Sequence, residues 1–260
     1  MRKSLWLSMV GCLAIVGALT LSVGPATAGV SPQPYTCTGG DVPSGTWSSV
    51  TITGFCQVPA DGSGWINIVG NLNVAPGAAF DAQSSPSTIT VEKNVTAGAG
   101  SLIGLGCQPN GAHFMHPCAN DPGGASVITV NGNVTATGAD TVLLNGITVK
   151  GNVTLAGGGG DSDWVVKGSK IGGNFTASNI VLDFFGLLYN QIGGNATLTT
   201  ITAIDPEDGG FGAVNIVLNV IGRNLNCSGL GPRLSAGFIP GAVNTTGGKS
   251  TGQCVGLVGG

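Results

Sequence analysis

Six aspartates are the residues in this chain best suited to acid–base or metal chemistry. Each lies seven to eleven residues after an asparagine that recurs along the sequence, which would place them near one edge of a repetitive fold. Clustered carboxylates can bind calcium or act as the acid and base of a glycosidase. Aspartate also favours turns for purely structural reasons, and we prefer that interpretation. The six are Asp81, Asp140, Asp161, Asp163, Asp183 and Asp205, of which the last four are the candidate catalytic residues.

The two histidines, His113 and His116, are the only candidates for a transition-metal site. Both lie between Cys107 and Cys118, and a His-x-x-His pair can chelate a metal if a third ligand, such as Asp121, is close. Two ligands alone make a weak site, so we prefer surface histidines on a small loop. We expect no cofactor, with calcium as the one option left open.

A third pattern places threonine two residues after the recurring asparagine. If these side chains point outward they form parallel ladders, and by analogy flat hydroxyl arrays on repetitive folds can bind ice or crystalline carbohydrate. Stacked asparagine and threonine also suit parallel strands without any ligand, which is the interpretation we favour. The ladder residues are Asn94, Asn133, Asn152, Asn174, Asn195, Thr96, Thr135, Thr154, Thr176 and Thr197.

Other functional signatures are missing from the sequence. It contains no G-x-S-x-G, no H-E-x-x-H and no phosphate-binding loop. Charged residues make up only 8% of the chain, and the basic ones are scattered without a visible patch. This composition argues against nucleic acid as a partner.

The elements that would position these residues come from an internal repeat. The copies Val149–Leu155, Ile171–Ala177 and Ile192–Leu198 recur about every twenty residues, the length of one β-solenoid turn. Two longer intervals each hold an insertion, at 106–124 and 205–212. We therefore predict an all-β, single-domain parallel β-helix, expected to be right-handed, with about eight turns and disulfide-closed ends.

Residues within one copy alternate as they do in a β-strand. In the first copy, Val149, Val153 and Leu155 share one parity, whereas Asn152 and Thr154 have the other. We expect the apolar set to face the core and the polar set to face solvent.

The start of the chain has the features of a secretory signal peptide. Arg2 and Lys3 precede an apolar run, and the triplet Ala26–Ala28 fits a cleavage site. We predict a signal peptide at 1–28 and a solenoid domain at 29–260, with no stable membrane span after cleavage.

Six cysteines remain beyond the predicted cleavage site. In an exported protein they indicate three disulfides, and their distribution favours neighbours pairing. The expected bonds are Cys37–Cys56 in an N-terminal cap region at 37–56, Cys107–Cys118 in the inserted loop, and Cys227–Cys254 in a C-terminal cap or tail at 225–260.

The segments Cys37–Thr46, Gly222–Gly229 and Gly252–Cys254, together with the repeat, resemble parts of a known group of proteins. These are secreted actinobacterial proteins with G-G-N-[LV]-T repeats and no assigned function; Arg223 departs from the usual second glycine. The repeat is more distantly similar to bactofilin-type and pectin-lyase-like parallel β-helices. The resemblance implies a solenoid fold and export but carries no site to transfer.

These observations favour a secreted, non-catalytic β-solenoid that acts as a structural or adhesive component of the cell envelope or extracellular space. Expected partners are cell-wall or extracellular polysaccharide, or further copies of the chain stacked end to end. The alternative is a polysaccharide hydrolase or lyase that uses the aspartates, and a minor alternative is ice binding through the Asn-x-Thr ladder.

Overall fold

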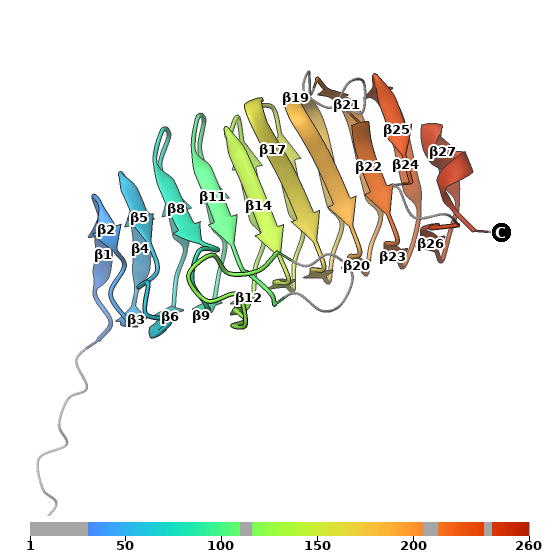
Figure 1. Cartoon of the computed structure of the whole chain (residues 1–260). Helices are drawn as coiled ribbons and strands as arrows, with labels where there is room; N and C mark the ends of the chain where they lie inside the picture. Colours follow the sequence, from blue (N-terminus) through green and yellow to red (C-terminus); the bar gives the residue numbers. More distant parts are fainter. Residues whose placement is uncertain (1–30, 110–115, 205–212, 237–240, 260) are drawn as a thin grey trace, which may run out of the picture. The chain divides into compact units, whose positions relative to one another are not determined.

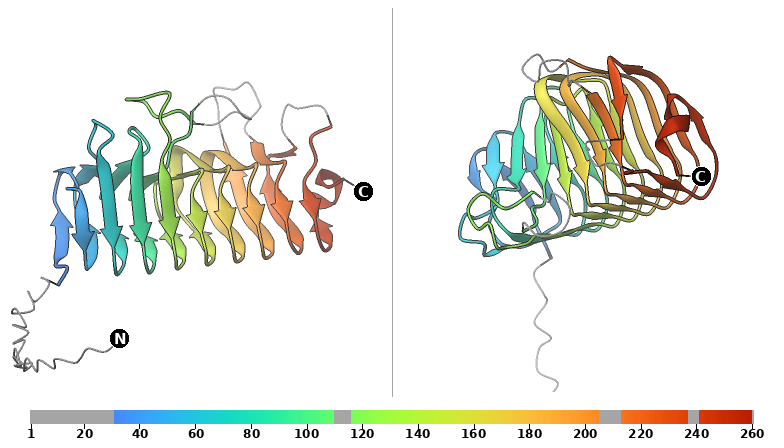
Figure 2. Two further views of the ribbon diagram at one scale, coloured as in Figure 1. Left: turned by 90° about the horizontal axis from the view of Figure 1, so that it is seen from below. Right: turned by 45° about the vertical axis from the view of Figure 1, so that its right-hand side comes forward.

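The alternating apolar residues of each repeat form short strands that stack in parallel, as expected. The computed structural model describes residues 31–109, 116–204, 213–236 and 241–259. Pro32–Gly260 forms one compact unit, whereas the predicted signal peptide, His113, Asp205 and the insertion at 205–212 lie outside the described residues. The unit is a parallel β-solenoid with three strand-lined faces (Figure 1, Figure 2). The fold prediction is therefore confirmed.

The three faces are named here by their strands. The ladder face contains β1 (Pro34–Cys37), β4 (Ser49–Ile52), β7 (Leu72–Val74), β10 (Val95–Ala97), β13 (Val134–Thr137), β16 (Val153–Ala156), the first part of β19 (Phe175–Leu188), β21 (Ala196–Ala203), β24 (Leu225–Gly231) and β27 (Ser250–Gly252). The cavity face contains β2 (Gly40–Asp41), β5 (Phe55–Gln57), β8 (Ala79–Ala82), β11 (Leu102–Leu105), β14 (Thr141–Asn145), β17 (Gly159–Lys167), the last part of β19, β22 (Ala213–Val217) and β25 (Arg233–Ser235).

The third face, the groove face, is a separate sheet of nine strands. It contains β3 (Gly45–Trp47), β6 (Gly64–Ile68), β9 (Ser87–Val91), β12 (Val127–Val130), β15 (Thr148–Val149), β18 (Lys170–Ile171), β20 (Gln191–Ile192), β23 (Val220–Ile221) and β26 (Thr245–Thr246). Its nine strands mean nine complete turns in the described residues, close to the predicted number of about eight, and β27 of the ladder face begins a further turn. A short 3-10 helix, η1 (Gln253–Leu257), follows the last strand.

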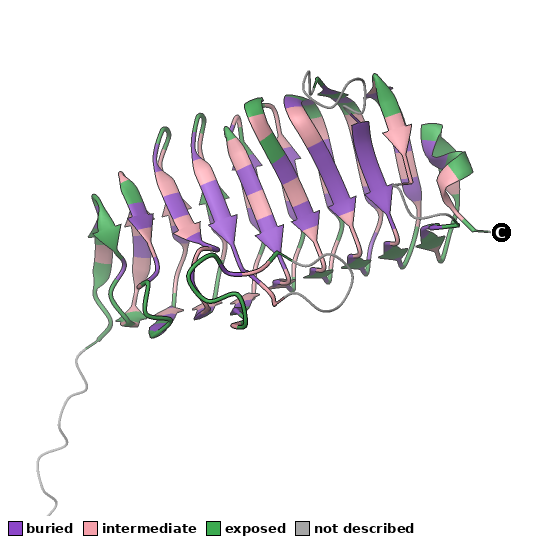
Figure 3. Cartoon of the chain, viewed as in Figure 1, coloured by how far each residue is buried: buried purple, intermediate pink, exposed green. Residues whose placement is uncertain are grey.

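The alternation predicted for the first repeat copy is confirmed by burial. Val149, Val153 and Leu155 are buried, whereas Asn152 is exposed and Thr154 is half-buried (Figure 3). Core residues at equivalent positions of neighbouring turns are complementary in size: the large Phe175 stacks on the small Ala196. Since one turn cannot bury its apolar face alone, stacking supplies the stability of the unit.

The bend between the ladder and cavity faces depends on left-handed backbone conformations. Strand β19 runs through this bend, and Asn179 within it has φ 57°. The register places Gly157, Thr200 and Gly229 at the same bend in neighbouring turns, and all three also have positive φ. Glycine and asparagine tolerate this conformation, whereas the β-branched Thr200 adopts it at a cost.

Close packing of successive turns explains the G-G-N motif. A Cβ atom on Gly172 would lie 2.4 Å from the carbonyl oxygen of Lys150, and one on Gly173 would lie 2.4 Å from the Oδ1 of Asn152. In this turn a side chain at either glycine would require the neighbouring turns to move apart, although Lys150 and Arg223 occupy the equivalent positions in other turns. We call the three-residue connection between the groove face and the ladder face the glycine corner.

A second asparagine ladder lies inside the solenoid, at the bend between the cavity face and the groove face. Asn190, Asn219 and Asn244 are buried there, and Ser169 begins the column. The Oδ1 atom of Asn219 accepts bonds from the backbone N–H (2.9 Å) and Nδ2 (3.0 Å) of Asn190. Its own Nδ2 donates to the carbonyl of Leu187 at 2.7 Å and to Asn244 Oδ1 at 2.9 Å. Every polar atom of this side chain is thus satisfied, as burial requires.

The three expected disulfides are present. Cys37–Cys56 joins the first two turns, Cys107–Cys118 closes the inserted segment between β11 and β12, and Cys227–Cys254 ties the last long strand to η1. Three disulfides are typical of an oxidising environment. No helix in the described ranges is long and apolar enough to cross a membrane.

Candidate functional site

Three of the candidate aspartates line one hollow on the cavity face. Asp161, Asp163 and Asp183 share a cavity of about 580 Å³ with His116 and Lys167. We call it the acid cavity. It combines acceptors from two neighbouring strands, β17 and β19, with an imidazole from the inserted loop.

A strand irregularity brings these carboxylates to the surface. The pairing of β17 with β19 shifts register between Gly160 and Asp163, so that Asp161 and Ser162 lie opposite the single residue Asp183 and one extra residue bulges from β17. Asp161 and Asp163 are exposed, and Asp183 is half-buried. Bulges commonly redirect side chains in this way. The carboxylates therefore lie at the solvent-facing side of their strands.

The electrostatics of His116 show that this residue lies against the cavity face. Desolvation by the surrounding protein lowers the pKa of His116, the nearby charge of Lys167 lowers it further, and Asp81 partly opposes both. Burial likewise lowers the pKa of Lys167. At neutral pH His116 is therefore mainly an uncharged imidazole, capable of accepting a proton or a hydrogen bond.

Two buried polar atoms near this loop lack a partner among the described residues. They are the Oδ1 of Asn145, a residue that lines the acid cavity, and the Nε2 of Gln83, which lines an adjoining cavity of about 230 Å³. His116 lines both cavities. Buried groups of this kind normally bind protein or water, so this region has unmet hydrogen-bonding capacity.

The remaining predicted site residues do not join this cluster. Asp81 lines the adjoining cavity, where its carboxylate accepts bonds from the backbone of Gln83 and Ser84. Asp140 is exposed at the bend before β14 and does not line the acid cavity. Within the described ranges, no three His, Cys, Asp or Glu side chains are grouped closely enough to hold a metal ion.

The predicted asparagine ladder forms and is held together internally. The Oδ1 of Asn133 accepts the backbone N–H of Asn152 at 2.8 Å, and the same bond recurs from Asn152 to Asn174 and from Asn174 to Asn195, each at 2.8 Å. Asn71, Asn94 and Asn224 continue the ladder towards the ends. These oxygens are thus used in joining successive turns.

The threonine column lies beside the asparagine ladder, but its central hydroxyl groups do not join successive turns. The register aligns ten positions, and in the described structure the hydroxyls of Thr135, Thr154, Thr176 and Thr197 make no hydrogen bond. Near the ends, Thr96 and Thr251 instead donate to asparagines, each at 2.8 Å. The central hydroxyls are therefore available to a ligand or to water. The ten positions are Thr36, Thr51, Asn73, Thr96, Thr135, Thr154, Thr176, Thr197, Asn226 and Thr251.

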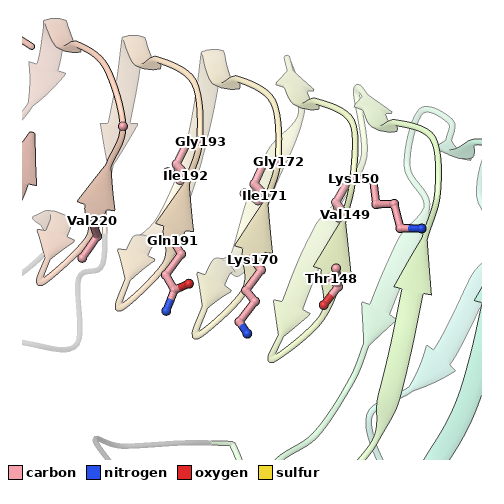
Figure 4. Close-up of a pocket in the computed structure, with 11 residues that line it drawn as sticks. Thr148, Val149, Lys150, Lys170, Ile171, Gly172, Gln191, Ile192, Gly193 and Val220 are labelled. Carbon is pink, nitrogen blue, oxygen red and sulfur yellow. The ribbon is translucent and has the colours of Figure 1, made fainter. Parts of the chain in front are cut away.

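A shallow groove of about 600 Å³ crosses four turns of the groove face (Figure 4). One side of the groove is formed by the outward-facing residues Thr148, Lys170, Gln191 and Val220. The other side is formed by Lys150 and by Gly172, Gly193 and Gly222, and we call these three glycines the glycine shelf. This groove was not predicted from the sequence, because its residues are about twenty positions apart and only the stacking of turns brings them together.

Comparison with known proteins adds no assignment. No family model matches the chain, and neither the curated proteins nor the solved structures contain a match. The resemblance to secreted actinobacterial repeat proteins therefore stays a prediction.

Proposed function

We propose that this protein is a secreted, non-catalytic β-solenoid that adheres to a neutral, repetitive polysaccharide surface through its ladder face. The observation that carries the proposal is the column of unpartnered threonine hydroxyls, repeated once per turn about 4.8 Å apart. A regular solid presents binding groups at fixed intervals, so a rigid array can engage many of them at once.

The chemistry of the rest of this face supports a neutral partner. Strands β10 to β24 contribute no Lys, Arg, Asp or Glu to the ladder face. Outward positions next to the threonines are small, as in Ala156, Ser178 and Thr199. A flat, uncharged surface of this type suits contact with hydroxyl-rich glycan chains, whereas a charged polymer would find no counter-charge there.

The test is binding to insoluble polysaccharides, namely microcrystalline cellulose, chitin and purified bacterial cell wall. The variant Thr154→Val/Thr176→Val removes two hydroxyls and keeps β-branched side chains in the strands. The matched control Thr90→Val/Thr129→Val makes the same change on the groove face, outside the groove. We expect the wild type and the control to sediment with at least one solid and the ladder variant to bind less. Equal binding by all three proteins, or no binding to any solid, would refute the proposal. Ice-crystal shaping that is lost only in the ladder variant would also contradict it and favour ice instead.

A second candidate function is polysaccharide cleavage at the acid cavity. One observation favours it: Asp161, Asp163 and Asp183 line the same cavity as the neutral imidazole of His116. Release of reducing ends or unsaturated products from soluble polysaccharides, abolished in Asp161→Asn/Asp163→Asn/Asp183→Asn, would establish it. Absence of any such release by the wild type would leave adhesion as the function.

A further inference from the structure

The charges of the protein are divided between its faces, although the sequence shows no basic patch. Of the seven Lys and Arg residues in the described ranges, five lie on the groove face or the adjoining glycine corner. Of the nine described Asp and Glu residues, only Glu92 lies there, and it accepts a hydrogen bond from Asn131. The others lie on the cavity face or in the connections at its edges. The five basic residues are Lys93, Lys150, Lys170, Arg223 and Lys249.

The groove described above lies within this basic region. Lys150 and Lys170 line it, and no acidic side chain does. Both lysines are exposed (Figure 4). The glycine shelf has no side chains to obstruct a bound chain, and Val220, 55% exposed, adds an apolar surface at one end. The groove runs across successive turns, so a linear polymer lying along it would meet a similar surface in each turn.

From these features we propose that the groove binds a linear, carboxylated polysaccharide. Its carboxylates would pair with Lys150 and Lys170, and its hydroxyls would bond to Gln191 and Thr148. The flatter faces of the sugar rings would rest on the glycine shelf and on Val220. This site is separate from the ladder face and does not depend on the function proposed for it.

Other extended polymers fit the groove less well. The N–H groups of Gly172, Gly193 and Gly222 already donate to the preceding turn at 2.8, 2.8 and 2.7 Å, so an added peptide strand has no free donors there. For the same reason the shelf offers no amide nest for phosphate or sulfate. No aromatic side chain lines the groove, so nucleobases would have nothing to stack on.

The experiment measures binding of soluble polygalacturonate at low ionic strength by isothermal titration calorimetry, with neutral dextran of similar length as the comparison polymer. We expect binding of polygalacturonate but not of dextran, weakened severalfold by about 0.2 M NaCl. Lys150→Gln/Lys170→Gln should weaken it about tenfold, since each exposed ion pair contributes modestly. Gln191→Glu, which adds one negative charge to the groove, should weaken it too.

The matched control is Lys93→Gln/Lys249→Gln, which removes two exposed lysines that do not line the groove. It should bind polygalacturonate like the wild type, and far-ultraviolet circular dichroism should show that all variants are folded. No binding by the wild type, equal binding of dextran, or an equal loss in both double variants would overturn the proposal. Failure of the ladder-face experiment would leave this result unaffected, because the two tests use different ligands and different residues.

Discussion

The second glycine of the G-G-N motif gives the sharpest test of how the turns pack. In the variant Gly173→Ala, the new Cβ atom would lie 2.4 Å from Asn152 Oδ1 and 2.8 Å from the carbonyl oxygen of Gly151. Both oxygens accept hydrogen bonds that join these turns, at 2.8 Å from the N–H of Asn174 and 2.9 Å from that of Gly173. The methyl group therefore cannot be added without moving two turns apart.

The chain itself contains a natural comparison at Arg223, where a side chain occupies the same position. There the ladder bond from the N–H of Asn224 to Asn195 Oδ1 lengthens to 3.2 Å, and the bond from Arg223 N–H to the Gly194 carbonyl lengthens to 3.1 Å. The corresponding bonds at Gly194 are both 2.8 Å. A side chain is thus tolerated near the end of the stack, at the expense of hydrogen-bond geometry.

From overpacking and two weakened hydrogen bonds, we expect Gly173→Ala to lower the free energy of unfolding by about 2–3 kcal/mol. The assay is equilibrium unfolding in guanidinium chloride with the disulfides intact, followed by far-ultraviolet circular dichroism. The control Gly256→Ala adds a methyl group where no atom lies within 4 Å, and should change stability by less than about 0.5 kcal/mol. Arg223→Gly should not destabilise the protein, although glycine usually costs about 0.5–1 kcal/mol. If Gly173→Ala matched the Gly256→Ala control, close packing would not be the reason for this glycine.

Three further predictions concern the buried ladder, the bend and the inserted loop. Asn219→Ala leaves several buried groups unpaired and should cost at least about 3 kcal/mol in the same unfolding assay. Thr200→Asn should stabilise by about 0.5–1 kcal/mol, because asparagine tolerates the left-handed conformation better; a loss of stability would contradict this. Because folding lowers the pKa of His116 below 6.5, the unfolded state binds its proton more readily, so this residue makes stability rise with pH up to about 6.5 and level off above. Lys167→Gln should raise the pKa of His116, measured by NMR titration in a His113→Gln background, and no change would mean that His116 does not lie close to Lys167.

The sequence alone determined most of the fold, for a physical reason. One solenoid turn is specified locally, by the alternation seen in Val149–Leu155 and by glycines at the corner, and repetition then aligns every turn with the next. The disulfide pairs also follow from this locality, since Cys37 and Cys56 belong to neighbouring turns. The threonine ladder could be predicted for the same reason.

Only the tertiary structure decided which scattered residues share a surface. Lys150 and Lys170 belong to different repeats, and the sequence showed no basic patch, yet stacking places both beside one groove. Spacing predicted that Asp161 and Asp183 would lie near one edge, but it did not indicate the strand bulge beside the acid cavity that they share. The buried Asn219 ladder was missed because the sequence cannot show that its side chain points inward at a bend. Local periodicity specifies each turn, whereas the content of a face depends on register and bulges that arise only when the turns are stacked.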